Sequence, residues 1–273
     1  MTSVQLETTG RPEDAAIASR RSGRRHVRRL GKALVFGGVV LLVYAATILL
    51  WRDPLTDVYA RYQQYRLDST LERSFVQFTA EFEDSITAAE RRAILAAKAD
   101  SANVDAKRAA VATAARRLRS SLERGDALGR LVIPALDVHP VVVHGTRWAQ
   151  ELSRGPGHYE RTTLPGLDKV VAIAGHRTTF GAPFRHIDDL ENGDVITLEM
   201  AYGKFEYRVF AHEIVRDDDW SILRPRGFDT LVLSACHPLY GSSHRWIVYA
   251  RLAAVEGSPV GDYRLPNAAP AKS

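Results

Sequence analysis

The second half of the chain is a succession of short apolar runs, and this pattern constrains the fold more than any other feature. Each run has the length and the β-branched or aromatic content of a strand, and turn residues such as those at 191–194 and 202–204 separate neighbouring runs. The runs lie at 131–133, 141–143, 170–173, 195–198, 205–210, 231–233 and 246–249. No long helical pattern lies between them, so residues 125–256 are expected to form a mainly β domain, as a small antiparallel barrel or sandwich.

The preceding segment, residues 53–124, has a helical character. Between Leu55 and Arg124 it contains no Gly or Pro and is rich in Ala, Glu, Arg and Leu, which are good helix formers. An apolar stripe with helical spacing is formed by Leu71, Phe75, Phe78 and Phe82. We expect a helical stalk or hairpin, broken into two helices near residues 100–103, that separates the β domain from a membrane. A dimerising coiled coil is less favoured, because the stripe is not a sustained heptad repeat.

Residues 32–52 are predicted to form a transmembrane anchor. The stretch 33–51 carries no charge, and at a rise of about 1.5 Å per residue it nearly spans a hydrocarbon core of about 30 Å. Basic residues precede it, so we expect a single-pass protein of the cell membrane with a cytoplasmic N-terminus and an extracytoplasmic β domain. A cleaved signal peptide is the less favoured alternative, because the apolar stretch is long and residues 51–54, Trp-Arg-Asp-Pro, do not resemble a small-residue cleavage site.

The net charge of +5 is confined to the N-terminal segment. Residues 1–31 are rich in Arg, Ser and Thr without apolar periodicity, and we expect a disordered basic tail there. Beyond residue 32, basic and acidic residues are equal in number, which disfavours nucleic-acid binding by a basic surface. The segment 257–273 is rich in Pro, Ala and Gly and is expected to be flexible.

The chain has a single cysteine, and two other chemically capable residues stand at comparable positions. Cys236 ends one apolar run, Arg245 opens the next, and His176 ends a third. Only residues 237–244 separate Cys236 from Arg245, so their strands can be antiparallel neighbours, with the end of one beside the start of the other. We therefore expect the thiol, the imidazole and the guanidinium to meet at one end of a sheet.

These three groups suit nucleophilic catalysis at a peptide bond. A thiolate of Cys236 can attack a carbonyl, and His176 can act as acid and base. Arg245 stays protonated, so it can only donate hydrogen bonds, to a substrate backbone or to a developing oxyanion. A lone cysteine is more often buried and inert. A thiol outside the membrane is open to oxidation, however, so a cysteine without a function there would be a liability. His237 competes with His176 for the acid–base role, although adjacent strand residues point to opposite faces.

No metal or cofactor is expected. The acidic run 217–219 lacks the alternating ligand spacing of a calcium loop and suits a solvated turn. Cys236 and His237 have no second ligand pair at a spacing that suits zinc.

Several motifs, taken in order, resemble those of sortases, and most of all the class E housekeeping sortases of actinobacteria. The motifs are Gly-Arg-Leu-Val-Ile-Pro at 129–134, Gly-Pro-Gly-His-Tyr at 155–159, the stretch 174–184 around His176, Cys-His-Pro at 236–238, and the strand 245–250. The resemblance covers about residues 125–255, whereas the tail, anchor and stalk match only in their order. It implies an eight-stranded β-barrel with His176, Cys236 and Arg245 as catalytic residues.

The resemblance also implies a reaction and its partners. A secreted protein would be cut between Thr and Gly of a C-terminal signal similar to Leu-Ala-X-Thr-Gly, and its acyl group would pass through a thioacyl intermediate to an amine of a lipid II-type peptidoglycan precursor. Tyr159 matches the position of a tyrosine that is linked to preference for this signal in class E enzymes. The family usually has Thr directly before the nucleophile, where this chain has Ala235. With His237, these are the residues expected to contact substrate.

Three alternatives remain at this point. An L,D-transpeptidase also uses Cys, His and Arg, but its histidine closely precedes its cysteine, which is not the order here. A pilin-polymerising or atypical-specificity sortase is the second alternative, although the chain lacks a lid signature before Gly125 and an apolar span after residue 257. The third is a catalytically degenerate membrane scaffold, whose thiol would not react with alkylating agents.

Overall fold

We describe the protein from a computed structural model that covers residues 12–50, 53–100, 103–258 and 261–265, with side chains from residue 28 to residue 47 in the first of these ranges. The chain divides into two compact units, Met1–Trp51 and Arg52–Ser273. The first unit contains α1 (Pro12–Leu50), and within it the stretch Arg28–Thr47 is long and apolar enough to cross a membrane.

Helix α1 differs from the sequence expectation in where it begins. We expected residues 1–31 to be disordered, but the helix already starts at Pro12 and includes residues 12–31. The reason is local: proline is well suited to the first helical position, and the Ala- and Arg-rich residues that follow are good helix formers. Residues 1–11 of the expected tail lie outside the described residues.

Three helices open the second unit, where the sequence predicted two. They are α2 (Pro54–Ser85), α3 (Ala88–Ala99) and α4 (Val104–Ser121). The additional break follows Ser85, where Thr87 accepts a hydrogen bond from the Glu90 backbone and Glu90 accepts one from the Thr87 backbone, at 3.2 and 2.7 Å. This capping box gives α3 its own N-terminus.

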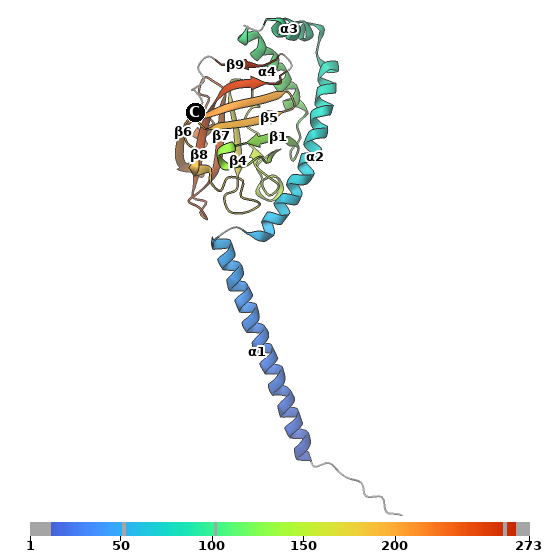
Figure 1. Cartoon of the computed structure of the whole chain (residues 1–273), viewed down its shortest axis with the longest axis vertical. Helices are drawn as coiled ribbons and strands as arrows, with labels where there is room; N and C mark the ends of the chain where they lie inside the picture. Colours follow the sequence, from blue (N-terminus) through green and yellow to red (C-terminus); the bar gives the residue numbers. More distant parts are fainter. Residues whose placement is uncertain (1–11, 51–52, 101–102, 259–260, 266–273) are drawn as a thin grey trace, which may run out of the picture. The chain divides into compact units, whose positions relative to one another are not determined.

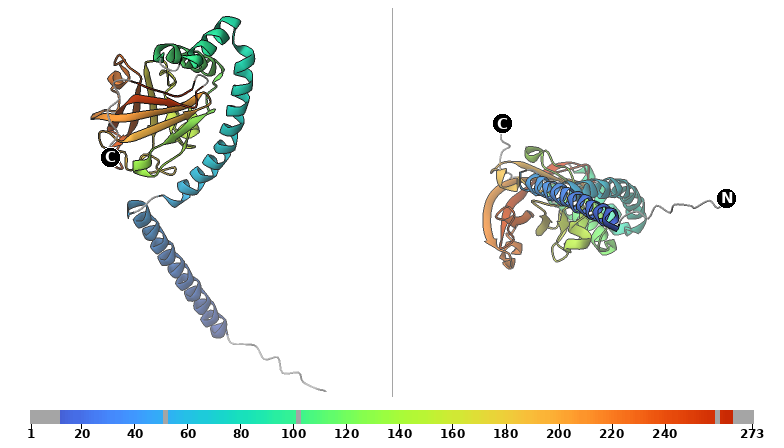
Figure 2. Two further views of the ribbon diagram at one scale, coloured as in Figure 1. Left: turned by 45° about the horizontal axis from the view of Figure 1, so that its top comes forward. Right: turned by 90° about the horizontal axis from the view of Figure 1, so that it is seen from below.

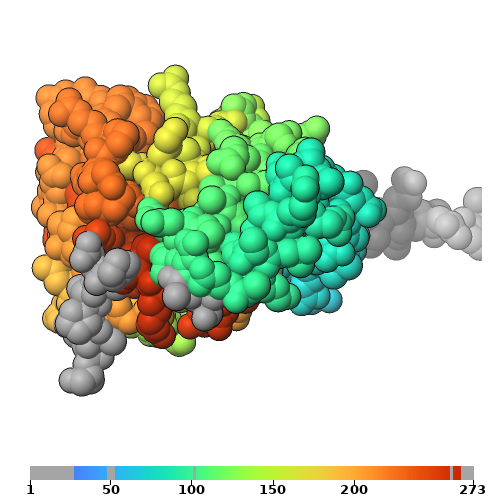
Figure 3. All heavy atoms as spheres, turned by 90° about the horizontal axis from the view of Figure 1, so that it is seen from above, coloured from blue at the N-terminus to red at the C-terminus, as the bar shows by residue number. Residues whose placement is uncertain are grey.

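The three helices pack against the β domain instead of forming a free stalk. Helix α2 runs along the side of the barrel, and α3 and α4 lie at one end of it (Figures 1 and 2). Seen from above, α3 and α4 cover much of that end (Figure 3). Leu67 and Leu71 of α2 pack with Val141 and Val143 in one buried cluster, and Val111 of α4 is fully buried in the main core. The expectation of a stalk is therefore corrected: the apolar stripes are buried on the barrel.

In the part of the chain that the structure describes, nine strands follow the helices. Their bounds are β1 (Ala127–Val132), β2 (Val141–His144), β3 (Gly157–His158), β4 (Val170–Gly175), β5 (Val195–Met200), β6 (Gly203–Arg216), β7 (Thr230–His237), β8 (His244–Glu256) and β9 (Tyr263–Arg264). The short helices between them are η1 (Pro134–Leu136), η2 (Trp148–Leu152), η3 (Ile187–Asp189) and η4 (Trp220–Leu223).

Strands β1 to β8 form a closed barrel. The order is β6-β5-β1-β2-β3-β4-β7-β8, and pairing of β6 with β8 closes it. The eight-stranded barrel expected from the sequence is thus confirmed. The expectation of an antiparallel barrel is corrected in two places, because β2–β3 and β4–β7 are parallel pairs. These pairs are joined through long connections, which parallel strands require.

Strand β9 lies in the segment expected to be flexible. Its residues pair with β8, and Tyr263 is only 6% exposed in the main core. Lys107 of α4 donates a hydrogen bond to the Asp262 carbonyl at 3.0 Å, so the C-terminal segment is tied down as far as Leu265. Residues 259–260 and 266–273 lie outside the described residues.

Candidate active site

The ends of β4, β7 and β8 bring the three predicted catalytic residues together. Cys236 and Arg245 are directly paired in the antiparallel register of β7 and β8. Gly175 is paired with Ala235 in the parallel register of β4 and β7, and His176 is the next residue along. His176, Cys236 and Arg245 therefore lie side by side at one end of the sheet.

The three residues also share the outer face of the barrel. Along β7, Leu231, Leu233 and Ala235 belong to the interior core, whereas Val232 belongs to a second apolar cluster outside it. Side chains alternate between faces along a strand, so Cys236 lies on the outer face with Val232. Ala172 and Ile247 also belong to the outer cluster. His176 lies four residues after Ala172 and Arg245 lies two residues before Ile247, so the same alternation places both on the outer face.

Cys236 is a free, half-buried cysteine, and a buried arginine holds the loop beside it. Arg177, only 4% exposed, donates to the Cys236 carbonyl at 3.5 Å and to the Arg185 carbonyl at 3.1 and 3.2 Å. Its guanidinium also pairs with Asp188 at 2.5 Å. Arg177 thus ties the loop after β4 to the strand end that carries the thiol. Its sequence signal is a charged residue directly after His176.

His176 sits in an apolar and aromatic environment. Its ring centroid lies 5.3 Å from that of Phe180 and 6.4 Å from that of Trp148. Its Nε2 is buried and has no hydrogen-bond partner among the described residues. Burial lowers the pKa of His176, because the imidazolium is disfavoured away from water. The neutral imidazole is therefore the main form at neutral pH.

The strand that carries His176 ends in a glycine for a packing reason. A Cβ placed on Gly175 would collide with the ring of Phe184, which is fully buried. The Phe184 N–H donates to the His176 carbonyl at 3.0 Å, so the loop returns to the strand end.

Arg245 is held by the loop between β7 and β8. Its Nη1 donates to the Ser242 carbonyl at 2.7 Å and to the His244 carbonyl at 2.9 Å. Both bonds use one nitrogen, and within the described part of the chain Nε and Nη2 have no further partner. Those N–H groups are therefore available to a ligand beside Cys236.

Tyr159 lies on the same outer face. It packs against the outer cluster, and its ring makes an edge contact with Trp220 of η4 at 6.3 Å. Ile222 and Leu223 of η4 also belong to this cluster. An apolar surface bordered by Tyr159 and η4 thus extends along the barrel on the face that carries the thiol.

Ala235 and His237 are placed differently from the sequence expectation. Ala235 is 2% exposed and belongs to the interior core, so it cannot touch a substrate on the outer face. His237 has the same orientation by alternation, and its ring packs on Trp246 at 5.6 Å. A step of one residue along a strand reverses the face, which explains both differences.

The hydroxyl on the thiol's own face is that of Ser234. Its register partners are Ala174 and Ile247, it is 1% exposed, and its Oγ has no hydrogen-bond partner among the described residues. Counting two residues back from Cys236 would have found it from the sequence.

A buried histidine pair supports the segment that carries Tyr159. His144 and His158 approach through their Nδ1 atoms at 3.0 Å, Arg119 donates to Nε2 of His144 at 3.1 Å, and Nε2 of His158 lies 2.9 Å from the Thr163 carbonyl. These contacts form a consistent donor chain only when both rings are neutral. Burial lowers the pKa of His158 to about 3, and burial with the nearby Arg119 lowers the pKa of His144.

This pair predicts acid destabilisation. Between pH 6.5 and about 3, His158 is protonated in the unfolded chain but stays neutral in the folded protein. The free energy of unfolding should therefore fall by about 1.4 kcal/mol for each pH unit of acidification in this range. Urea unfolding at pH 6 and pH 5 would measure the slope. In His158→Gln the slope should be smaller by about that amount, and parallel slopes in the two proteins would contradict the prediction.

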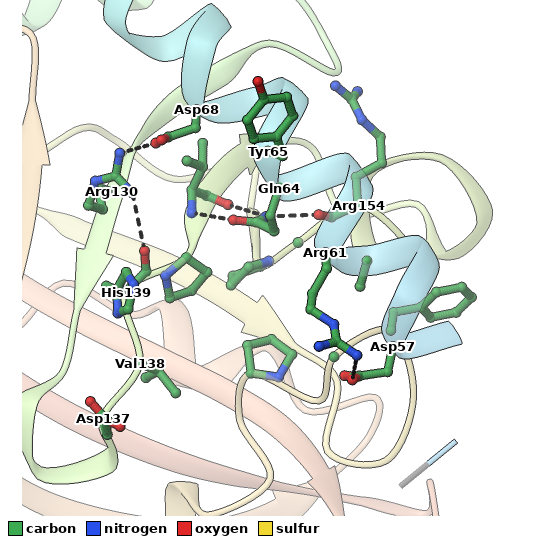
Figure 4. Close-up of a pocket in the computed structure, with 18 residues that line it drawn as sticks. Asp57, Arg61, Gln64, Tyr65, Asp68, Arg130, Asp137, Val138, His139 and Arg154 are labelled. Atoms are coloured by element: carbon green, nitrogen blue, oxygen red, sulfur yellow. Dashed lines mark hydrogen bonds and ion pairs between the residues drawn. The ribbon is translucent and has the colours of Figure 1, made fainter. Parts of the chain in front are cut away.

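A cavity of about 500 Å³ lies between α2 and the barrel (Figure 4). Cys236 and Arg245 are not among the residues that line it. Its polar groups pair with one another: Asp57 with Arg61, Asp68 with Arg130, and Gln64 with the Val141 and Arg154 backbones. The pairs of Asp68 and Gln64 join the helix to the barrel, and none of the described residues that line the cavity has a buried side-chain N or O atom without a hydrogen-bond partner.

The barrel is similar in sequence to known proteins. The family model named Sortase domain matches residues 131–253. The chain is 34% identical over 133 residues to sortase D of Bacillus subtilis, and 32% identical over 152 residues to sortase SrtE1 of Streptomyces coelicolor. These matches cover 47% and 50% of this chain but 65% and 43% of the relatives, so the chain spans less than two thirds of either relative.

A solved structure of Streptomyces coelicolor sortase E1, with a tripeptide in its active site, is 30% identical and aligns with a TM-score of 0.46 over 48% of this chain and 90% of that one. The family match covers nearly all of the barrel and includes His176 and Cys236 with Arg245. Residues 131–253 therefore match a sortase domain, and the relatives that this chain resembles are sortases.

Proposed function

We propose that this chain is a membrane-anchored sortase that cuts a Leu-Ala-X-Thr-Gly-like signal between Thr and Gly and transfers the acyl group to an amine of a peptidoglycan precursor. The observation that carries the proposal is the meeting of Cys236, His176 and Arg245 on one outer face of a sortase barrel. The partners are secreted proteins with the signal, and a lipid II-type amine.

The chemistry follows from the three side chains. His176 takes the proton of the Cys236 thiol, the resulting thiolate attacks the Thr carbonyl carbon, a C–S bond forms as the carbonyl π bond opens, and Arg245 donates to the oxyanion. The C–N bond then breaks, and the His176 imidazolium gives its proton to the leaving Gly amine. An incoming amine attacks the thioester and His176 takes its proton. The C–S bond then breaks to release the new amide, and the imidazolium returns the proton to the sulfur, which restores the thiol.

The apolar surface beside the thiol supports a peptide signal of this kind. Tyr159, Ile222 and Leu223 border the outer face of β4 and β7. We infer that the Leu and Ala side chains of the signal pack there, since burial of small apolar side chains needs such a surface. The resemblance of the 155–159 segment to class E sortases adds support for Ala before X.

The anchor proposal rests on α1. Its stretch Arg28–Thr47 is long and apolar enough for one crossing, and the basic residues of the preceding segment favour a cytoplasmic N-terminus. The catalytic unit would then act outside the membrane, where secreted substrates and wall precursors are found.

The test uses the compact unit from residue 53 onward. It would be mixed with Leu-Ala-X-Thr-Gly or Leu-Pro-X-Thr-Gly peptides and an amine nucleophile, and the products followed by mass spectrometry. Ligation that favours the Ala peptide supports the proposal, and ligation that favours the Pro peptide overturns its signal preference. Absence of any product with both peptides, while Cys236 resists alkylation, would favour the degenerate scaffold.

Arg245 is expected to act through its geometry as well as its charge. In Arg245→Lys, kcat/KM should fall by about 10²–10³-fold, because lysine keeps the charge but cannot donate in the same fork. Alkylation of Cys236 by iodoacetamide should change far less, since it needs no oxyanion donor. Arg251→Lys is the matched control on β8: its guanidinium lies 4.4 Å from the Phe228 ring centroid, at the other end of the strand. Equal losses in both variants would refute the role of Arg245.

A further inference from the structure

The loop after His176 has an unusual backbone. Phe180, Gly181 and Ala182 have φ values of 51°, 76° and 44°. Positive φ is uncommon for residues with a side chain and costs free energy, so such a conformation persists only where its surroundings hold it. The loop therefore needs a partner.

That partner is the first part of α2. The Phe180 N–H donates to the Thr56 hydroxyl oxygen at 3.0 Å, and the Tyr59 ring meets the Phe180 ring edge-on at 6.1 Å. Ala60 is buried, and a Cβ on Gly181 would lie 3.3 Å from the Ala60 Cβ. The spacing of residues 56, 59 and 60 places them on one face of α2. One turn of the helix therefore packs against one turn of the loop.

Phe180 also packs against His176. Its ring lies 5.3 Å from the imidazole and 5.7 Å from Trp148, whose own ring is 6.4 Å from the imidazole. The other tether of the loop end, from the Phe184 N–H to the His176 carbonyl, holds the backbone and not the ring. The ring is thus packed by Phe180 and Trp148, and Phe180 is placed by α2.

We propose that Thr56 and Tyr59 of α2 are positioning residues for His176, so that the helix directly following the anchor segment is required for proton transfer at the active site. This inference rests on the proposed acid–base role of His176, but its physical content, control of the imidazole by α2, does not depend on activity.

The experiment compares Tyr59→Ala with Tyr62→Ala in the full-length chain in detergent. Both are exposed tyrosines of α2, 43% and 57% respectively, but the Tyr59 ring lies beside Phe180 of the loop, whereas the Tyr62 ring lies beside Arg66, 6.0 Å from its guanidinium carbon. We expect Tyr59→Ala to lower kcat for ligation by about tenfold with KM within twofold, since a displaced acid–base group slows chemistry more than binding. Thr56→Val should act in the same direction.

Conservative variants provide the rescue. Tyr59→Phe keeps the ring and Thr56→Ser keeps the hydroxyl, so each should retain activity within about twofold of the wild type. Tyr62→Ala should also retain it. If Tyr59→Ala and Thr56→Val both keep full kcat, or if Tyr62→Ala loses as much as Tyr59→Ala, the positioning role is refuted.

A second readout does not require a substrate. The NMR signal of the His176 ring, assigned with His176→Gln, should titrate below the ordinary histidine range in the wild type, because burial lowers its pKa. In Tyr59→Ala the midpoint should rise toward the ordinary value as the ring loses its cover, and in Tyr62→Ala it should not. If the wild type ligates no signal peptide but the ring responds as expected, the proposed function fails and the positioning inference stands. An unchanged midpoint in Tyr59→Ala overturns the inference.

Discussion

Replacing Cys236 with alanine is expected to abolish transpeptidation. The ligation rate should fall by at least about four orders of magnitude, as in other enzymes that lose a covalent nucleophile. The reason is that the chain has no second cysteine to act as nucleophile. Ser234, two residues before Cys236 on the same face, is buried and cannot replace it. Intact-mass spectrometry checks this directly: wild-type protein with signal peptide should gain the mass of the acyl fragment ending in Thr, and Cys236→Ala should not.

The control for this variant is stability. Cys236 is only half-buried at a strand end, so Cys236→Ala should unfold within a few degrees of the wild type. An acyl adduct or substantial ligation in a folded Cys236→Ala protein would show that the nucleophile lies elsewhere, and would overturn the assignment of the site.

Removal of residues 53–124 is expected to prevent the barrel from folding. Helix α4 places Val111, Ala114 and Ala115 in the main core with no exposed surface, and Val111 packs closely against Gly166. Exposing these contacts, with those of Leu67 and Leu71 on α2, forfeits about 1.5–3 kcal/mol for each large side chain, against a total stability of about 5–15 kcal/mol. Near-UV circular dichroism and thermal unfolding should show a cooperative transition for the chain from residue 53, and none for the chain from residue 125.

A point variant separates the helix contact from the deletion. The Gln64 side chain accepts from the Val141 N–H at 2.7 Å and donates to the Val141 and Arg154 carbonyls at 3.1 and 2.8 Å (Figure 4). Gln64→Ala should lower the free energy of unfolding by about 1–3 kcal/mol, since it leaves backbone groups without hydrogen-bond partners, whereas Gln63→Ala should have little effect.

For the deletion of residues 53–124, a barrel from residue 125 that unfolds cooperatively at the same temperature as the chain from residue 53 would show that the helices are dispensable.

The sequence predicted seven of the nine strands in the described part of the chain, because an apolar run is a local pattern, but the two-residue strands β3 and β9 were not predicted. The apolar runs near residues 170–173 and 231–233 became β4 and β7, and the short connection before Arg245 made β7 and β8 antiparallel neighbours. Strand partners far apart in the chain were not readable in this way. The pairing of β4 with β7, which puts His176 beside Cys236, joins segments separated by most of the barrel and is set by closure of the sheet.

The helices show the same limit. The stripe through Leu71 and Phe82 indicated that one face of residues 53–124 must be buried, but a stripe does not say against what. In the structure it packs on the barrel, and the helix break at Thr87 follows from the capping box of Thr87 and Glu90, which are three residues apart in the sequence.

The sequence by itself therefore determined the helical, β and apolar segments, the lone thiol and its two polar companions, because composition and periodicity are properties of neighbouring residues. Only the tertiary structure decided the face on which each side chain lies, the inward orientation of Ala235, and the grip of α2 on the loop after His176. These depend on contacts between segments far apart in the chain, and such contacts are chosen by packing of the whole core.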